Sequence, residues 1–408
     1  MTRLLIADAR VLTLVGPPRP RRGDAMRALG ILPRADVLLH DDRIEAVGPN
    51  LPRPAGATIV DAAGRVLMPG FVDCHTHACW AGQRFDEFDM KLAGAAYLDI
   101  LAAGGGIMST VRAVRAADVD DLASGLALRL ERMLALGTTT AEVKSGYGLR
   151  TDAELRMLLA VRAAAERSPM TVVPTFLGAH AIDRDRPNFI DETIEETLPA
   201  VVDAFPGITC DAYCETGAWS VEDTCRLFRA AAARGCPLRV HTDQFHSLGM
   251  TRAAIELGAS SVDHLEAVDP ADLPRLAASD TIAVALPCSG FHLDGRYAPG
   301  RAIVDAGAAL AIATNYNPGS APTPSMPFAI ALACRELGLT PAEAIVASTV
   351  NGACVLGLGA DRGQIAPGAR ADVQLLDSTD ERELAYEFAT PGPRLVVSGG
   401  RIVARRAV

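Results

Sequence analysis

The sequence predicts a (β/α)8 barrel together with a small sheet domain that both ends of the chain form. Apolar, β-rich runs alternate with long helical patterns from Phe71 to about Gly357, and short strand-like runs without such helices occupy both chain ends. Eight strands alternating with helices over roughly 290 residues are typical of this barrel, which needs about 250 residues plus insertions. A doubly wound open sheet is the alternative, but no Gly-rich phosphate loop follows a strand.

Length, charge and cysteine content exclude several classes of function. The chain has 408 residues and a formal net charge of −10, and no Lys/Arg run resembles a phosphate-binding patch. Nucleic acid is therefore not an expected partner. No apolar run reaches the ~20 residues that cross a bilayer, and the run before Asp8 is too short for a signal peptide. Nine cysteines without framework spacing predict reduced thiols and a cytoplasmic protein.

Both ends of the chain are expected to consist of short strands and turns. The strand-like runs are 4–6, 37–39, 44–47 and 58–60 near the start, and 372–376, 394–398 and 400–403 near the end. The stretch 17–30 is rich in Pro and Arg and is expected to be a loop in which Arg19, Arg21 and Arg22 are solvated. Because chain termini often lie close together, residues 1–67 and 358–408 are predicted to form one domain beside a barrel of residues 68–357.

The barrel strands are predicted from apolar, β-branched runs that each end near a polar residue. They cover 71–73, 138–143, 171–176, 208–213, 238–241, 260–263, 282–286 and 309–313. Helices rich in Ala, Leu, Arg and Glu are expected between them, including 118–136, 152–166, 191–204, 220–234 and 250–257. Residues at the C-terminal ends of the strands build the site of such a barrel.

The first strand carries the strongest chemical signal. His75 and His77 follow Phe71 and Val72 after a Pro-Gly break. Residues two apart on a strand point to the same face, so both imidazoles project to one side. Two neutral imidazoles form half of a divalent-metal site, although this pair alone is also compatible with two surface histidines.

The distribution of the other histidines strengthens the metal hypothesis. Five of the eight fall at predicted strand ends, namely His75, His77, His180, His241 and His264. Scattered surface histidines would not follow this pattern, so we expect a metal site at one mouth of the barrel. The other polar residues at or just beyond strand ends are Glu142, Lys144, Tyr147, Glu215, Gln244, Asn315 and Asn317.

Five runs of the sequence resemble a known family. Residues 69–77 resemble the signature of the amidohydrolase superfamily, and the runs 142–148, 176–180, 241–244 and 317–320 are similar to those of the imidazolonepropionase family within it. The resemblance covers nearly the whole chain. It implies a distorted (β/α)8 barrel with a small β-sandwich made from both chain ends. The implied reaction is hydrolysis of 4-imidazolone-5-propanoate to N-formimidoyl-L-glutamate in histidine degradation.

The same resemblance implies ligands and partners. One zinc or iron ion, divalent or trivalent, would be held by His75, His77, His241 and Asn315. A small-molecule substrate and a homodimer are expected, with neither nucleic acid nor membrane as partner. The positions that match the substrate contacts of the family are Arg84, Tyr147, His180, Gln244, Asn317, Gly319 and Ser320.

The expected chemistry agrees with these residue types. A metal lowers the pKa of its water from 15.7 to roughly 7–9 and so supplies a nucleophile. His264 is the first candidate to polarise the ring carbonyl, and His180 is the second. Arg84 offers a bidentate fork to the propanoate tail, or else pairs with Asp86 or Glu87. For Lys144 we favour a structural ion pair with Glu142 over a carboxylated, metal-bridging lysine.

One position departs from the family pattern. The family has Asp where this chain has Asn315, and that Asp both ligates the metal and takes a proton from the attacking water. Asn315 offers a carbonyl oxygen but cannot accept this proton, a role worth about 10²–10⁴-fold. Three explanations stay open: deliberate replacement to trap a ligand, a slow variant whose base is another group such as His264, or a different substrate. The alternative functions are a superfamily deaminase of an aminated ring and a catalytically dead ligand-binding relative.

Overall fold

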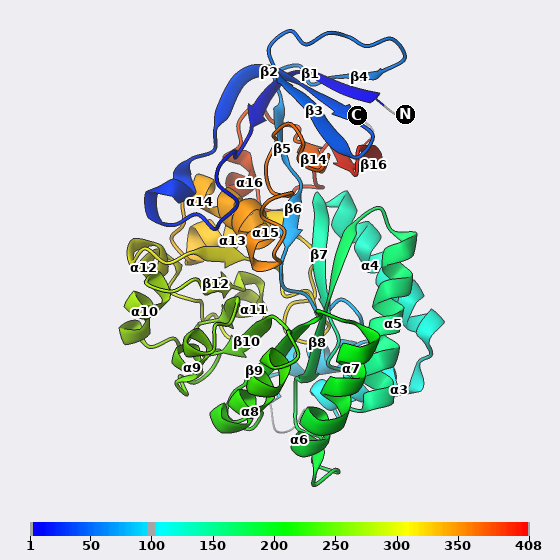
Figure 1. Ribbon diagram of the computed structural model, residues 1–408, viewed down its shortest axis with the longest axis vertical. Helices are drawn as coiled ribbons and strands as arrows, with labels where there is room; N and C mark the ends of the chain where they lie inside the picture. The colour runs from blue at the N-terminus through cyan, green and yellow to red at the C-terminus, as the bar shows by residue number, and fades with distance from the viewer. Residues whose placement is uncertain (1–2, 96–102, 407–408) are drawn as a thin grey trace.

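The larger part of the molecule is a barrel of eight parallel strands (Figure 1). The computed structural model describes residues 3–95 and 103–406. Neighbouring strands follow chain order around the barrel, which rules out a doubly wound sheet. The strands are β6 (Phe71–Asp73), β7 (Thr138–Lys144), β8 (Thr171–Ala179), β9 (Thr209–Cys214), β10 (Leu238–Thr242), β11 (Ser261–His264), β12 (Ile282–Ala285) and β13 (Leu310–Ile312). All eight predicted strands are thus present, with bounds shifted by three residues at most.

The barrel closes just beyond the ends of β6 and β13. Thr76 and Tyr316 form a parallel bridge there, and the His77 N–H donates to the Tyr316 carbonyl at 3.0 Å. The Asn315 N–H donates to the carbonyl of His75 at 3.1 Å. The barrel is therefore closed by this short bridge instead of a full ladder between β6 and β13. This closure brings the first predicted metal ligand next to the last.

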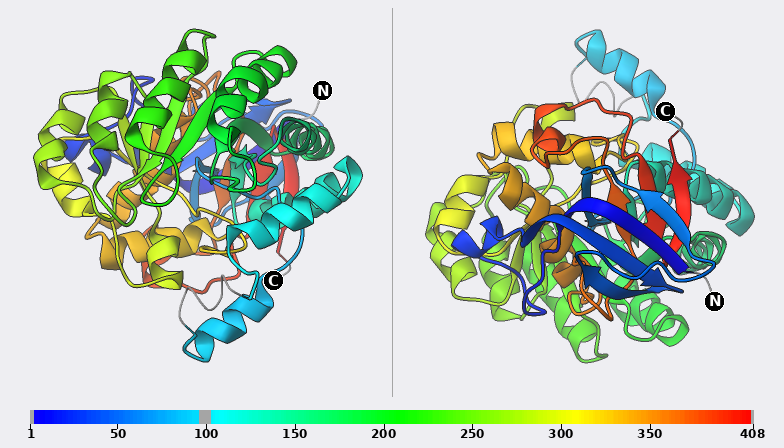
Figure 2. Two further views of the ribbon diagram at one scale, coloured as in Figure 1. Left: turned by 90° about the horizontal axis from the view of Figure 1, so that it is seen from below. Right: turned by 90° about the horizontal axis from the view of Figure 1, so that it is seen from above.

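Helices cover the outside of the barrel between successive strands (Figures 1 and 2). The largest apolar cluster fills the space between the strands and these helices and includes Phe176, Trp219 and Phe228. The helices before β9 are α1 (Phe85–Leu92), α3 (Ile107–Ala116), α4 (Val119–Ala135), α5 (Thr151–Arg167), α6 (Phe189–Glu192), the π-helix η2 (Thr193–Thr197) and α7 (Leu198–Ala204). Those between β9 and β13 are α8 (Val221–Ala232), α9 (Met250–Glu256), η3 (Pro270–Asp272), α10 (Leu273–Ala277), α11 (Pro287–His292) and α12 (Gly300–Asp305). After β13 follow α13 (Met326–Glu336), α14 (Pro341–Val346), the π-helix η4 (Ala347–Asn351), α15 (Gly352–Val355) and α16 (Glu383–Tyr386).

Both chain ends form one mixed sheet, as predicted. Seven of its strands follow the order β16-β15-β14-β5-β1-β2-β3, and β4 pairs with β1. The blue and red strands of this sheet lie side by side in the right view of Figure 2. Side chains from both limbs of the sheet pack into one apolar cluster. The strands are β1 (Arg3–Leu12), β2 (Ile31–His40), β3 (Arg43–Gly48), β4 (Thr58–Asp61), β5 (Val66–Pro69), β14 (Val373–Leu375), β15 (Leu395–Ser398) and β16 (Arg401–Arg405).

The join between sheet and barrel lies at Gly70. β5 belongs to the terminal sheet and β6 to the barrel, so the predicted border after residue 67 falls inside β5. A Cβ on Gly70 would lie 2.2 Å from the hydroxyl of Thr139, so only glycine fits this close approach. Because β6 begins at the terminal sheet, its far end carries His75 and His77 to the opposite mouth of the barrel (Figure 1).

The Pro- and Arg-rich stretch is not the solvated loop that the sequence suggests. It contains the 3-10 helix η1 (Gly23–Arg27), and two of its arginines are anchored. Arg21 is buried and donates to the carbonyls of Leu14 and Ala28. Arg22 donates to the carbonyls of Ala277 and Ser279 on the barrel at 2.9 and 2.6 Å. Arg19 is exposed, as predicted. The prediction was wrong for Arg21, whose partners are nearby carbonyls, and for Arg22, whose partners lie on the distant barrel.

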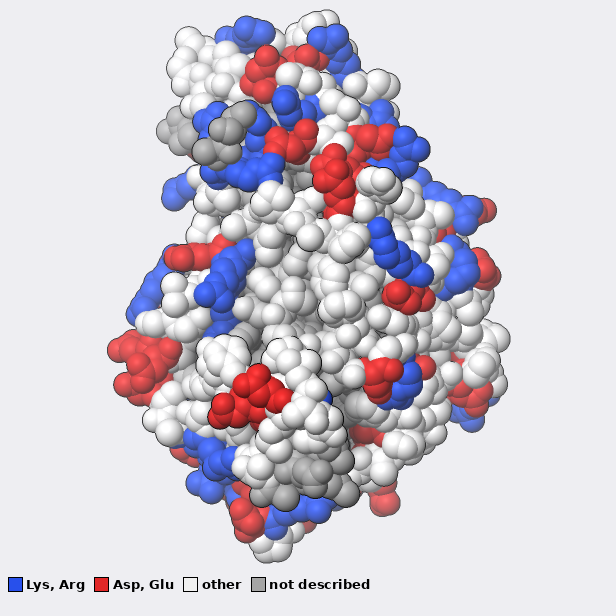
Figure 3. All heavy atoms as spheres, turned by 180° about the vertical axis from the view of Figure 1, so that it is seen from behind, with Lys and Arg blue, Asp and Glu red and all other residues white. Residues whose placement is uncertain are grey.

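Surface charge and thiols agree with the composition. Acidic and basic side chains are interspersed on the face shown in Figure 3, without a broad basic area. Within residues 3–95 and 103–406, no helix is long and apolar enough to cross a membrane. All nine cysteines lie in these ranges and are free thiols.

Candidate functional site

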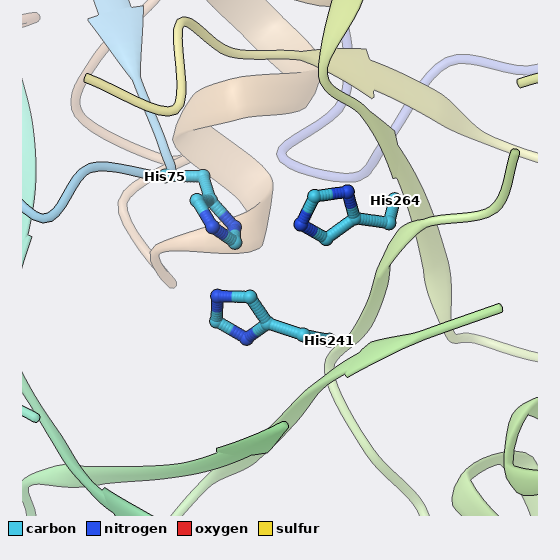
Figure 4. Close-up of side chains that lie close together, drawn as sticks. All are labelled: His75, His241 and His264. Carbon is cyan, nitrogen blue, oxygen red and sulfur yellow. The ribbon is translucent and has the colours of Figure 1, made fainter. Parts of the chain in front are cut away.

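Three histidines from three barrel strands converge at the mouth that β6 reaches. His75 follows β6, His241 lies on β10, and His264 ends β11 (Figure 4). One ring nitrogen from each lies within 4.8 Å of the others, and all three residues are buried. The ring centroids of His75 and His241 are 4.4 Å apart. This spacing suits three ligands of one metal ion.

His77 and His180 extend this cluster. The Nε2 atoms of His77 and His241 are 3.2 Å apart. The ring of His180 stacks on that of His77, with centroids 4.7 Å apart and planes inclined by 18°. The Nδ1 atom of His180 lies 3.1 Å from the carbonyl of Gly146. All five histidines predicted at strand ends therefore meet in one site, although His77 lies outside the most compact triad.

Two buried carboxylates fix the orientation of the triad. Nδ1 of His75 lies 2.6 Å from Asp263, and Nδ1 of His241 lies 3.1 Å from Asp211. A carboxylate only accepts hydrogen bonds, so each Nδ1 carries the hydrogen and each Nε2 keeps its lone pair. The Nε2 of His75 is buried without a hydrogen-bond partner among the described residues. These lone pairs are what a metal ion requires.

Asn315 completes the donor set. Its Nδ2 donates to the hydroxyl of Ser289 at 2.7 Å, and its Oδ1 is buried without a partner among the described residues. An unpaired buried carbonyl oxygen is costly, and a cation would satisfy it. The residues present therefore fit a metal ion: Nε2 of His75 and Oδ1 of Asn315 are buried without a partner among the described residues, and the backbone bond between the two residues keeps them adjacent.

The electrostatics favour neutral imidazoles. Burial lowers the pKa of His75 and His77 well below the usual value, and the nearby Lys144 and neighbouring histidines lower it further. Burial, with His241 close by, lowers the pKa of His180 to about 3. Burial also lowers the pKa of His241, although Asp211 opposes this shift. Neutral imidazoles are the form that binds a metal.

Backbone conformation is unusual at this mouth. His264 and Asn315 have φ angles of +86° and +55°, in the left-handed region that β-carbons disfavour. His264 is the last residue of β11, and Asn315 lies three residues after the end of β13. Non-glycine residues held in this conformation concentrate at functional sites.

Tyr147 is held above the site by a buried carboxylate. Glu154 accepts hydrogen bonds from the N–H groups of Gly146, Gly148 and Leu149 at 2.9, 2.8 and 2.8 Å. The Tyr147 ring is 5.2 Å from that of His180, centroid to centroid. Burial raises the pKa of Tyr147, so the phenol keeps its proton and can donate a hydrogen bond.

Arg84 lies beside the predicted substrate loop. It pairs with Glu87, with contacts of 2.8 and 2.5 Å, so the alternative ion pair is present. A Cβ on Gly319 would lie 2.2 Å from Nη1 of Arg84, which places the guanidinium against this glycine. The charge of Arg84 also acts on Lys91 and His292, and burial together with these charges lowers the pKa of His292. A lowered pKa keeps His292 uncharged near neutral pH, so the positive charge beside the loop comes from Arg84 and Lys91.

Hydrogen bonds of the Asn317 side chain hold the 317–320 turn together. Asn317 Nδ2 donates to the Asn315 carbonyl and the Ser320 hydroxyl at 2.6 and 2.8 Å. Its Oδ1 accepts from the N–H groups of Gly319 and Ser320, both at 2.8 Å. All polar atoms of the Asn317 side chain are therefore used inside the turn, and the side chain fixes how Gly319 and Ser320 are presented.

Gln244 lies in the loop that follows β10. The hydroxyl of Tyr213 donates to its Oε1 at 3.0 Å. Glu215, which follows β9, accepts from the N–H groups of Phe245 and His246 at 2.8 and 3.1 Å and thereby holds the loop that carries Gln244. A small cavity beside this loop is lined by Gln244, Glu266, Ser289 and neighbouring residues.

Several residues of the site were not predicted from the sequence. Asp211, Asp263, Ser289 and Glu154 each orient a residue that was. The sequence did indicate a role for Asp211 and Asp263, because a carboxylate inside a buried strand requires a specific partner. Lys144 does form the favoured ion pair with Glu142, at 2.7 Å, and it also pairs with Asp211 at 2.6 Å.

The chain is similar in sequence to proteins of a known family. Residues 66–403 match the model of the amidohydrolase family. The chain is 45% identical over 417 residues to the imidazolonepropionase of Herpetosiphon aurantiacus, covering 99% of this chain and 97% of that protein. It is 47% identical over 369 residues to the imidazolonepropionase of Deinococcus radiodurans, covering 90% and 92%.

Solved structures share the fold at lower identity. Guanine deaminase from E. coli is 16% identical with a TM-score of 0.76, over 100% of both chains. An adenosine deaminase from Xanthomonas campestris with bound zinc is 19% identical with a TM-score of 0.69, over 98% of this chain and 92% of that chain.

Proposed function

The chain belongs to the amidohydrolase family, as one of the imidazolonepropionases, and on this premise we propose that it hydrolyses the ring amide of 4-imidazolone-5-propanoate to N-formimidoyl-L-glutamate. The observation that carries the proposal is the convergence of histidines at one mouth of the barrel. One ring nitrogen each of His75, His241 and His264 lies within 4.8 Å of the others, and Nε2 of His77 lies 3.2 Å from that of His241. A metal there, zinc or iron, supplies a water of lowered pKa as the nucleophile when it is bound.

The proposed ligands are His75, His77, His241 and Asn315. Asp263 and Asp211 keep the imidazoles of His75 and His241 in the tautomer that presents Nε2. His77 fits this set because its Nε2 lies against that of His241. Asn315 contributes Oδ1, and Ser289 holds its amide group by accepting from Nδ2.

His264 takes the proton in this proposal. Asn315 is neutral and cannot act as a general base. The Nδ1 of His264 lies 3.2 Å from Glu266, so the carboxylate orients the ring and leaves Nε2 free to accept a proton. The resulting imidazolium can then donate to the leaving ring nitrogen, which is the usual sequence of general base and general acid.

The positive charge of Arg84, with that of Lys91 acting close by, suits the anionic tail of the substrate. Arg84 offers a planar fork that matches a carboxylate. The ring of Tyr147 lies beside that of His180, which stacks on His77, and both side chains would hydrogen-bond the substrate ring. Gln244, Gly319 and Ser320 are proposed as further contacts, with Asn317 shaping the turn.

One experiment tests the function. The purified protein is analysed for metal and assayed on imidazolone propanoate before and after chelation and after addition of zinc or iron. We expect bound metal, formation of formimidoyl-glutamate, loss of activity on chelation and recovery with metal. Ammonia release from an aminated ring, without formimidoyl-glutamate, would identify a deaminase instead. Binding without turnover by the metal-loaded protein would identify the non-catalytic relative that Asn315 favours.

We further propose that the protein is cytoplasmic and works as a homodimer. Nine free thiols support a reducing compartment. Light scattering of the purified protein tests the second proposal, and a mass equal to one 42.8 kDa chain would contradict it.

A further inference from the structure

Five buried charged side chains form a continuous network directly beneath the histidines. Each is at most 1% exposed, which is unusual because the interior of such barrels is normally filled by apolar layers. The members come from β7, β9, β10 and β11 and are Glu142, Lys144, Asp211, Arg239 and Asp263.

Glu142 is the centre of this network. It pairs with Lys144 at 2.7 Å and with Arg239 at 2.6 Å. Lys144 continues to Asp211 at 2.6 Å, and Arg239 continues to Asp263 at 2.6 Å. Both arms therefore start at one carboxylate.

Each arm ends on a histidine of the triad. Asp211 contacts Nδ1 of His241, and Asp263 contacts Nδ1 of His75. The side chain of Glu142 touches neither histidine in any hydrogen bond of the described residues. Its remaining partner is the hydroxyl of Thr175, which donates at 2.6 Å. Its influence on a bound ion must pass through the two arms and through its charge.

The charges of the network do not cancel. Three carboxylates face two cations, which leaves one excess negative charge in a buried site. The proposed ligands, three imidazoles and the amide of Asn315, are all neutral. A buried cation without a nearby anion is strongly disfavoured, so the excess charge would offset this cost.

We propose that Glu142 is a positioning residue whose negative charge, relayed by the Lys144–Asp211 and Arg239–Asp263 pairs, sets the affinity of the site for its metal ion. The inference rests on the proposed metal site and adds to it the residue that balances the charge of the ion. It assigns to this barrel layer a role in metal retention instead of barrel stability alone.

The test separates the effect of the negative charge at position 142 from that of the side-chain size. Metal dissociation constants are measured by competition with a chelator for wild type, Glu142→Gln and Glu142→Asp, with zinc as the probe. Glu142→Gln keeps the size and removes the charge, and we expect zinc to bind about 10- to 100-fold more weakly, as for other partners that orient metal ligands. Glu142→Asp keeps the charge and should retain most of the affinity.

Glu154→Gln is the matched control. Glu154 is equally buried, but it accepts from backbone N–H groups of the Tyr147 loop and has no bond to the network. We expect it to leave zinc affinity unchanged. Wild-type affinity in Glu142→Gln, or an equal loss in Glu142→Asp and Glu142→Gln, would overturn the charge-balancing role.

If Glu142→Gln fails to fold, two milder variants at position 175 provide the test. Thr175→Val removes one hydrogen bond to Glu142 without changing any charge, whereas Thr175→Ser keeps it. We expect weaker zinc binding, by about threefold or more, in the valine variant only. Equal affinity in the two variants would overturn the proposal. Absence of zinc binding by the wild type would instead contradict the proposed function itself.

Discussion

Asn315 and Ser289 are joined by a hydrogen bond of 2.7 Å in which the amide Nδ2 of Asn315 donates to the serine hydroxyl. The bond turns Oδ1 of Asn315 away from Ser289 and leaves it without a partner among the described residues. A carboxylate at the same position would accept from Ser289 with one oxygen and keep the other for a proton.

Asn315→Asp should increase turnover. An aspartate restores a group that takes a proton from the attacking water, and general-base catalysis is worth about 10²–10⁴-fold, so we expect kcat to rise by at least about 10². The measurement is steady-state kinetics on imidazolone propanoate with both forms fully loaded with metal. Equal rates would mean that an aspartate at position 315 adds nothing to the general-base catalysis that the proposal assigns to His264.

His77 and His264 should differ in what they contribute. We expect His77→Asn to lower the metal content of the purified protein, because His77 is a proposed ligand adjacent to His241. His264→Asn should keep the metal but lose about 10²–10⁴-fold in kcat, because it removes the proposed base. Elemental analysis alongside kinetics separates the two roles. If His264→Asn lost the metal and His77→Asn kept all of it, the two roles would be reversed. The ligands would then be the compact triad His75, His241 and His264.

Glu154→Gln should weaken catalysis without affecting the metal. The amide presents two N–H donors where the carboxylate accepts from three backbone N–H groups, so the Tyr147 loop would shift. Misplacement of a substrate-positioning loop can cost up to about 10²-fold, and we expect kcat/KM to fall by about 10- to 100-fold. Asp152→Asn on the same helix is the control, because that side chain is 71% exposed. Unchanged kcat/KM in Glu154→Gln would argue against a role for this loop.

Glu343 should make stability depend on pH. It forms a capping box with Thr340 at the start of α14 and pairs with Arg301 and Arg27 at 2.9 and 3.0 Å. Burial raises its pKa, but the hydrogen bonds from Arg301, Thr340 and Arg27 outweigh burial and lower the pKa from 4.5 to about 2. A depressed pKa in the folded state means that the stabilisation is complete above the unfolded-state value and is lost as the pH falls towards 2.

Glu343→Gln should therefore destabilise the protein at pH 7 by roughly 1–3 kcal/mol, reduced from the full shift because solvent screens the two arginines. The difference from wild type should narrow as the pH falls from 4.5 towards 2. Urea unfolding of the metal-free protein at several pH values measures both. Asp305→Asn, at the more exposed partner of Arg301, should change stability little. A wild-type-to-variant difference that stays constant down to pH 3 would contradict the prediction.

Local pattern was sufficient for the elements of this fold. Strand and helix positions follow from apolar runs and their spacing, because β-branched buried strands and Ala/Leu-rich amphipathic helices have distinct periods. The histidines at strand ends could be assigned to one mouth because parallel strands of a barrel all end on the same side. The solvation of Arg22 was misjudged because its partners, the carbonyls of Ala277 and Ser279, lie some 250 residues away.

By itself, the sequence determined the barrel, the sheet from both chain ends, and the set of imidazoles that meet at one mouth, since these depend on local period and strand direction. Only the tertiary structure decided which carboxylate orients which imidazole and that Asn315 donates a hydrogen bond to Ser289. It also decided that five charged side chains lie buried beneath the histidines. Such pairings depend on side-chain directions and distances across strands, and no spacing along the chain encodes them. The physical reason is that a buried polar atom is satisfied by whatever the closed barrel brings within about 3 Å.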